Sequence, residues 1–331
     1  MPLHDASYKH WEGVHLGLWH RRFAIAENGL TSCLQNRSIK HLVVICWVTA
    51  LLASAILFMA GQLLVADSLI VQWVGNLSPE LQAFAGMLTK WLEDHPEISV
   101  RTTQNVLFYY YSIALMPMSI FSLGMAMPLL LTRDLASNSI IIYSSKAVNL
   151  FDYLVGKFCT ACGLVFLSWL GPLCATWFFG NLLSPDWRFF WHSRAALAHV
   201  MVYGLASMLV LGMLSLGISA TSSKEKSTSF YWFLWWILGA VLTPIATKTQ
   251  PWLRHLSFSF NLDQLAMAVF RVGDDIKVAQ DNIPILGDML RQVSARTIAN
   301  MSSPEIGNSV LALALMIGAA AWIVAKRVKP E

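Results

Sequence analysis

The chain has 331 residues, of which 56% are hydrophobic and 13% charged, with a formal net charge of +4 at pH 7. A soluble domain carries about twice that share of charged residues, so the composition argues against a soluble protein. The basic residues are spread over the ends of apolar segments, where lipid headgroups account for them. We therefore expect a membrane protein with no nucleic-acid partner.

Residues 1–41 precede the first long apolar run and predict a cytoplasmic or interfacial arm. Spacings of three and four, as on one face of a helix, separate five of its residues: Trp19, Phe23, Ala26, Leu30 and Cys33. We expect this interfacial elbow helix to lie on membrane lipid, with Trp19 and Phe23 at the interface and Arg21 and Arg22 near anionic headgroups. A solvated cytoplasmic arm is the alternative.

Six apolar runs follow, at residues 42–65, 107–131, 158–182, 197–220, 230–247 and 309–325. Each is close to the roughly 17–25 residues that a membrane-spanning helix needs. The runs are continuous and do not alternate with polar residues, which predicts helices and not barrel strands. The sequence therefore predicts an all-α membrane protein, a single domain over residues 1–331 whose six-helix part covers residues 42–325.

Lys and Arg residues gather on one side of these runs: before the first, between the second and third, between the fourth and fifth, and after the sixth. That side is cytoplasmic by the positive-inside rule. We expect a multi-pass protein of a bacterial-type inner (plasma) membrane, with both termini in the cytoplasm.

The connection between the second and third runs, residues 132–157, mixes charged, hydroxyl and apolar side chains, as a docking segment for a soluble partner does. It contains an acidic residue, a Ser-Lys turn and a Gly-Lys pair before the third run: Asp134, Ser145, Lys146, Gly156 and Lys157. With these residues, an elbow helix and six spans, the chain resembles the ABC-2 type transporter permeases, the membrane subunits of ABC transporters. Ala147 stands where those proteins commonly have proline.

The resemblance implies that this loop carries a coupling helix, at about residues 135–153, which inserts into a separate ATP-binding subunit. The residues that would make this contact are Asp134, Ser145, Lys146, Gly156 and Lys157. The resemblance also implies an exporter that works with a second permease copy or a paralogue. ATP and Mg would bind to the partner, and this chain would have no catalytic, cofactor-binding or metal residues. In the alternative interpretation, Asp134 and Lys157 only anchor helix ends at the headgroup level.

Three observations bear on the energy source and on enzyme activity. No Gly-x-x-x-x-Gly-Lys-Ser/Thr motif occurs, so ATP would be hydrolysed by another chain. The apolar runs hold almost no Asp, Glu, Lys or Arg, which argues against an ion-driven carrier. A membrane enzyme is less favoured, because neither His-Glu-x-x-His nor Gly-x-Ser-x-Gly is present. A non-transporting anchor subunit of a larger complex would share every one of these features.

The last outer loop, residues 248–308, is long enough to hold helices of its own. Residues 262–272 and 285–298 look helical, separated by Gly273-Asp274-Asp275 and Asn282-Ile283-Pro284. ABC-2 type permeases have short re-entrant helices here, and the loop is a candidate contact for a periplasmic or extracellular partner. A further outer helix is predicted from Ser78-Pro79-Glu80 onward.

Overall fold

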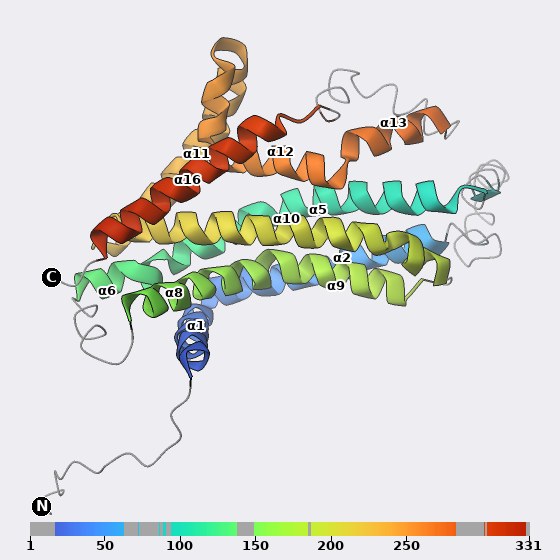
Figure 1. Cartoon of the computed structure of the whole chain (residues 1–331). Helices are drawn as coiled ribbons and strands as arrows, with labels where there is room; N and C mark the ends of the chain where they lie inside the picture. The colour runs from blue at the N-terminus through green and yellow to red at the C-terminus, as the bar shows by residue number, and fades with distance from the viewer. Residues whose placement is uncertain are drawn as a thin grey trace, which may run out of the picture.

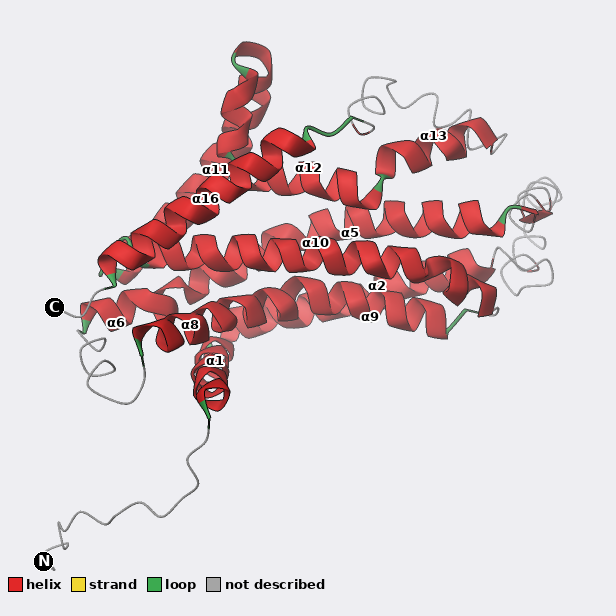
Figure 2. Ribbon diagram, viewed as in Figure 1, coloured by secondary structure: helices red, strands yellow, loops and turns green. Residues whose placement is uncertain are grey.

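The computed structural model describes residues 17–62, 94–137, 149–184, 187–282 and 303–328, together with a few isolated positions. These residues are almost entirely helical, and none of them lies in a strand (Figure 1, Figure 2). Six of the described helices are long and apolar enough to cross a membrane. The predicted all-α membrane fold is thereby confirmed.

The spans follow the predicted order but are longer than the apolar runs. They are α2 (Arg37–Gln62), α5 (Pro96–Met127) with η1 (Pro128–Thr132) and α6 (Arg133–Ala136), α8 (Leu150–Val165) with η2 (Phe166–Leu170) and α9 (Gly171–Leu182), α10 (Trp187–Ser219), α11 (Glu225–Thr249) and α16 (Ile306–Arg327). The second span, for example, begins at Pro96 and not near residue 107. Helical hydrogen bonding continues past the apolar stretch, because polar residues outside the hydrocarbon are compatible with helix.

The helix before the spans, α1 (Leu18–Gln35), runs across the bundle and packs against α8 (Figure 1). Glycines permit this close crossing. A Cβ atom added to Gly156 of α8 would lie 2.6 Å from Ile25 Cγ2, and one added to Gly163 would lie 3.3 Å from Leu30 Cδ2. Without side chains at these positions, the two backbones approach closely.

Two helices follow α11 and the short η3 turn (Pro251–Leu256): α12 (Phe258–Phe270) and α13 (Val272–Asn282). The predicted separator at 273–275 is wrong. The chain breaks at Arg271, whose φ is 52°, and the two aspartates form the first turn of α13, where acidic side chains favour the helix dipole. The predicted helix at 285–298 lies outside the described residues, and so does the one after Ser78 apart from residues 86, 89 and 90, which are helical.

α12 enters the bundle and does not merely cover its end, and α13 continues on from it without folding back (Figure 1). α12 packs against α5, α10, α11 and α16, and α13 packs along the N-terminal part of α5 (Figure 1). The largest fully buried side chains of the bundle include Trp169, Trp232, Tyr203 and Phe108. Phe258 and Phe270 of α12 are also fully buried, and the Phe270 ring centre lies 5.6 Å from that of Tyr203. Side chains of α12 therefore reach the interior of the bundle.

Candidate functional site at the α6 end of the bundle

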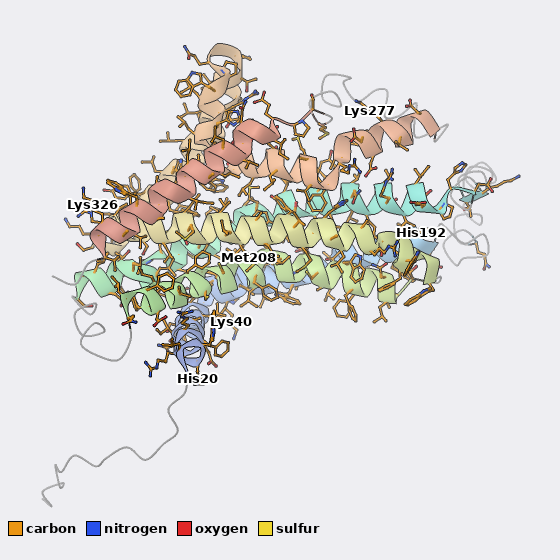
Figure 3. The ribbon with its side chains drawn as sticks, in the orientation of Figure 1. His20, Lys40, His192, Met208, Lys277 and Lys326 are labelled. Atoms are coloured by element: carbon orange, nitrogen blue, oxygen red, sulfur yellow. The ribbon has the colours of Figure 1, made fainter. Side chains whose placement is uncertain are left out.

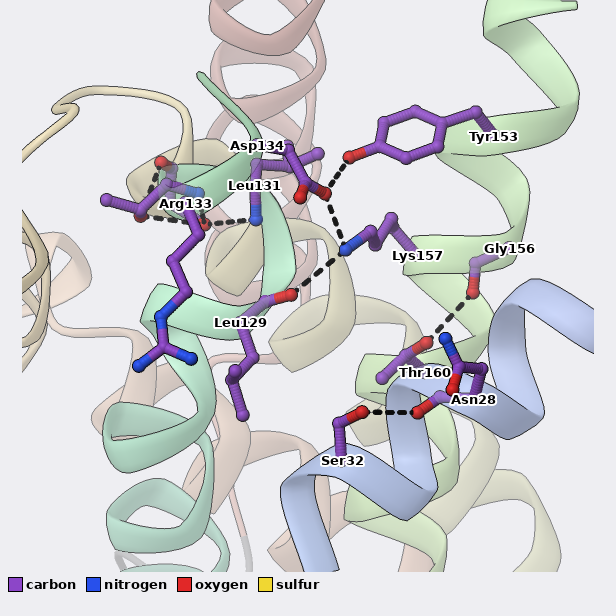
Figure 4. Close-up of polar contacts among 12 residues, drawn as sticks. Asn28, Ser32, Leu129, Leu131, Arg133, Asp134, Tyr153, Gly156, Lys157 and Thr160 are labelled. Atoms are coloured by element: carbon purple, nitrogen blue, oxygen red, sulfur yellow. Dashed lines mark hydrogen bonds and ion pairs between the residues drawn. The ribbon is translucent and has the colours of Figure 1, made fainter. Parts of the chain in front are cut away.

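An ion pair joins the end of the second span to the start of the third. Lys157 Nζ of α8 lies 2.7 Å from Asp134 Oδ2 of α6. The ammonium also donates to the Leu129 carbonyl oxygen at 3.0 Å, and the Tyr153 hydroxyl donates to Asp134 Oδ2 (Figure 4). Asp134, Tyr153 and Lys157 together are called the clasp.

The clasp is partly shielded from solvent, since the side chains of Lys157 and Asp134 are only 12% and 19% exposed. A pair at this depth loses hydration but regains hydrogen bonds from Tyr153 and the Leu129 carbonyl. Removing one partner would leave the other charge partly buried and unpaired. The clasp therefore fixes α6 to α8 on either side of the connection at residues 138–148.

A second ion pair ties α1 to α8. Arg22 Nη2 lies 2.5 Å from Asp152 Oδ1, and the Asp152 side chain is 5% exposed. The guanidinium also lies over the Trp19 ring, 4.7 Å from its centre. Trp19 and Phe23 themselves are 76% and 63% exposed. Arg22 thus holds the elbow helix to the bundle, while the neighbouring aromatic side chains point outward as interfacial residues do.

Hydroxyl groups from neighbouring helices satisfy the irregular backbone of η1. Pro128 cannot donate to the Gly124 carbonyl, and Ser229 Oγ of α11 donates to that oxygen at 2.8 Å. Ser219 Oγ of α10 accepts from the Leu131 amide at 2.8 Å and donates to the Met127 carbonyl at 2.9 Å. The Thr132 hydroxyl of η1 also donates to Thr228 Oγ1 of α11 at 3.2 Å, so this π-helical turn is linked by hydrogen bonds to the fourth and fifth spans, beside the clasp.

Arg133 and Glu225 connect α6 to α11 at the same end. Arg133 Nε lies 2.8 Å from Glu225 Oε1, and the side chains are 55% and 48% exposed. An exposed pair of this kind adds little stability. A cavity of about 400 Å³ lies between this end of the bundle and α1, and its lining includes Arg133, the clasp residues, and Asn28 and Ser32 of α1.

The predicted contact residues have different places in this site. Asp134 and Lys157 lie against each other, whereas Gly156 faces α1 in the helix crossing. Ser145 and Lys146 lie outside the described residues. Contact of these five residues with an ATP-binding subunit stays a prediction.

Sequence reasoning missed Tyr153 and Asp152. Tyr153 lies four residues before Lys157 on the same face of α8, and this spacing was a usable signal. No local pattern pointed to Asp152, because its partner Arg22 is 130 positions away.

A second polar cluster lies at the opposite end, where α13 meets α5. Asp275 Oδ2 accepts from Asn105 Nδ2 at 2.7 Å, and Asp275 Oδ1 lies 3.2 Å from Arg101 Nε. His199 Nδ1 of α10 is 3.1 Å from Asn105 Oδ1. In α12, Asp263 Oδ1 accepts from the Tyr109 hydroxyl at 3.0 Å. Two carboxylates, one from α12 and one from α13, thus contact the spans, although the apolar runs hold almost none.

The chain matches no model of a protein family and no curated protein sequence. The fold supports the class, a multi-pass helical membrane protein. The particular function is a matter for proposal.

Proposed function

We propose that the chain is the membrane-spanning permease subunit of an ATP-driven ABC transporter of the ABC-2 type. It works as an exporter, together with a second copy of itself or a paralogue. ATP and Mg bind to a separate ATP-binding subunit, and that subunit hydrolyses the ATP. The proposal rests on the sequence resemblance and on one structural observation, which is the clasp at the base of residues 138–148.

The clasp gives that connection a firm base. Asp134 precedes it and Lys157 follows it, so their 2.7 Å contact closes a loop whose middle contains Ser145 and Lys146. Under the proposal, Ser145 and Lys146 touch the ATP-binding subunit. Asp134 and Lys157 are satisfied within this chain, and they hold the loop in place from behind.

A displacement of this loop can be transmitted to the spans through a series of contacts. The clasp joins α6 to α8, and the Leu129 carbonyl joins the clasp to η1. Ser219 joins η1 to α10, and Thr228 joins η1 to α11 through the Thr132 hydroxyl. A π-helical turn beside a proline is a place where a helix bends at low cost. Closure of the ATP-binding subunit would therefore move the second span relative to the fourth and fifth, as alternating access requires.

The test is purification of the tagged protein from its native membrane in mild detergent, followed by mass spectrometry of what accompanies it. We expect a chain with a Gly-x-x-x-x-Gly-Lys-Ser/Thr motif. Lys146→Ala and Lys157→Ala should lower its recovery several-fold. The exchanged pair Asp134→Lys with Lys157→Asp should restore part of the loss. Lys226→Ala, an exposed lysine at the same end but outside the loop, is the matched control.

Two results would count against the proposal. Good recovery of the bait without any ATP-binding chain would favour an anchor subunit or an enzyme. Recovery of an ATP-binding chain whose hydrolysis drives no export in sealed vesicles would assign the loop to assembly alone.

A further inference from the structure

A polar cluster ties the start of the sixth span to the turn that follows the fifth. Glu305 is the residue before α16, and its carboxylate accepts from Arg254 through Oε1 and lies 3.1 Å from His255 Nε2 through Oε2. Arg254 and His255 both belong to η3, which also packs against α11 and α12. The Glu305 amide donates to Gln264 Oε1 of α12 at 3.0 Å. The cluster therefore lies just beyond the ends of the fifth and sixth spans, at the end of α11 opposite the clasp.

The orientation of the Asn261 side chain in this cluster is fixed by its neighbours. Its amide nitrogen donates to the His255 carbonyl oxygen at 2.7 Å and to the Ser257 carbonyl oxygen at 2.9 Å. A carbonyl oxygen can only accept, so the amide group cannot be turned over without losing both bonds. Asn261 is fully buried, and its side-chain oxygen lies 2.8 Å from His255 Nδ1. Nδ1 of His255 therefore faces an acceptor.

Both ring nitrogens of His255 consequently face acceptors, which are Asn261 Oδ1 and Glu305 Oε2. A neutral imidazole has one N–H group and can serve only one of these acceptors, whereas the charged imidazolium has two and serves both. The His255 side chain is only 13% exposed, and its ring packs edge to face against Phe260, with the ring centres 5.4 Å apart. The packing therefore holds the ring in place between its two acceptors.

The charged groups around His255 come from each element that packs against η3. Glu305 before α16 pairs with the ring, and Arg254 of η3 binds the other oxygen of the same carboxylate and holds it in position. Asp263 of α12 is hydrogen-bonded to α5 instead. Lys248 in the last turn of α11 is exposed. Among the residues that the structure describes, Glu305 is therefore the carboxylate that pairs with the charged ring.

We propose that His255 is a proton-binding site that latches the start of α16 to η3 and α12. With a proton on each ring nitrogen, the ring bridges Asn261 and Glu305, and this latch is closed. When one proton leaves to water, the other stays on Nδ1, because the buried Asn261 oxygen would otherwise lose its donor. Glu305 is 38% exposed, so water replaces the bond that it loses. The latch is therefore closed in acid and opens as the pH rises through the range in which histidines titrate, with or without a partner ATPase.

Hydrogen exchange of the purified full-length protein in detergent, followed by mass spectrometry between about pH 5 and pH 8, tests the latch. The intrinsic exchange rate at each pH is divided by the measured rate to give a protection factor. We expect the protection factors in the first turns of α16 to fall about 3- to 10-fold as the pH rises, the order expected for loss of one partly exposed, charge-assisted hydrogen bond. His255→Gln should lower them at acid pH and remove their dependence on pH.

His192→Gln, which removes a histidine near the start of α10, is the matched control and should keep the wild-type dependence on pH. His255→Asn is a second variant without a titrating ring, in case His255→Gln does not fold. The same fall with pH in either His255 variant as in the wild type would overturn the proposal, because another group would then be responsible. Protection factors of the wild type that stay constant or rise with pH would overturn it as well.

Discussion

Single glycines set how closely α1 approaches α8. We predict that Gly156→Ala lowers the free energy of unfolding by about 1–3 kcal/mol, because the added Cβ would lie 2.6 Å from Ile25 Cγ2 and 3.3 Å from the Arg22 carbonyl oxygen. Gly318→Ala in α16 is the control, since nothing lies within 4 Å of its added Cβ. An alanine there should be neutral or should stabilise the helix by up to about 1 kcal/mol. Denaturant unfolding in detergent measures both, and equal effects at the two positions would contradict the close crossing.

The reactivity of the Cys33 thiol tests how α1 packs near its C-terminal end. Burial raises the pKa of Cys33 to about 11, and the charge of Lys157 opposes this only in part. Because the thiolate is the reactive form, a variant that keeps only Cys33 should react with maleimide far more slowly at pH 7.5 than an unfolded control. Its rate should rise about tenfold per pH unit until the pH approaches the pKa. A rate at pH 7.5 equal to that of the unfolded control would show that α1 does not bury this residue.

At the scale of elements, α13 is attached to α5 by the buried carboxylate of Asp275. Asp275→Ala removes the acceptor for Arg101 and leaves the buried Asn105 amide without it. We expect a loss of about 1–3 kcal/mol in the local stability of α13, so its amide hydrogens should exchange roughly 10- to 100-fold faster. Hydrogen exchange followed by mass spectrometry over residues 272–282 is the measurement.

Asp274→Ala is the matched control for that experiment. It removes the same charge from the neighbouring position, but the Asp274 side chain is exposed. Exchange in α13 should therefore stay close to the wild-type rate. Equal acceleration in both variants would mean that helix charge, and not the contact with α5, holds α13.

The sequence predicts elements where one physical signal dominates. Continuous apolar runs predicted all six spans, because a bilayer selects helices of one length. The break at Arg271 has no local signature, since a left-handed residue other than glycine is rare and Gly273-Asp274-Asp275 resembles a turn. Asp134 and Lys157 were singled out by resemblance, but their mutual contact follows from how α6 meets α8. Such tertiary pairings are not encoded in local spacing.

At the scale of the whole molecule, the spans divide into a central and a peripheral set. The most apolar windows of the second, third and fourth spans are 56–61% buried within the chain, whereas those of α2, α11 and α16 are 28%, 17% and 22% buried. The exposed side chains of the peripheral helices include Leu51, Leu52, Val241, Leu315 and Trp322. A surface this apolar has to be covered by lipid or, as proposed, partly by a second copy.

The orientation of the bundle is the last prediction. Lys277 of α13 and Lys326 near the end of α16 lie at opposite ends of the bundle, and both side chains are exposed (Figure 3). The distribution of basic residues predicts that the Lys326 end is cytoplasmic. In a background where the exposed Cys159 is replaced by alanine, Lys277→Cys should react with a membrane-impermeant maleimide in intact cells. Lys326→Cys should react only after permeabilisation, with labelling of the denatured protein as the reference for both. The reverse pattern would place the clasp outside the cytoplasm, where no ATP-binding subunit could reach it. Labelling of both positions in intact cells would put the two residues on the same side of the membrane, which would contradict the single span α16 between them.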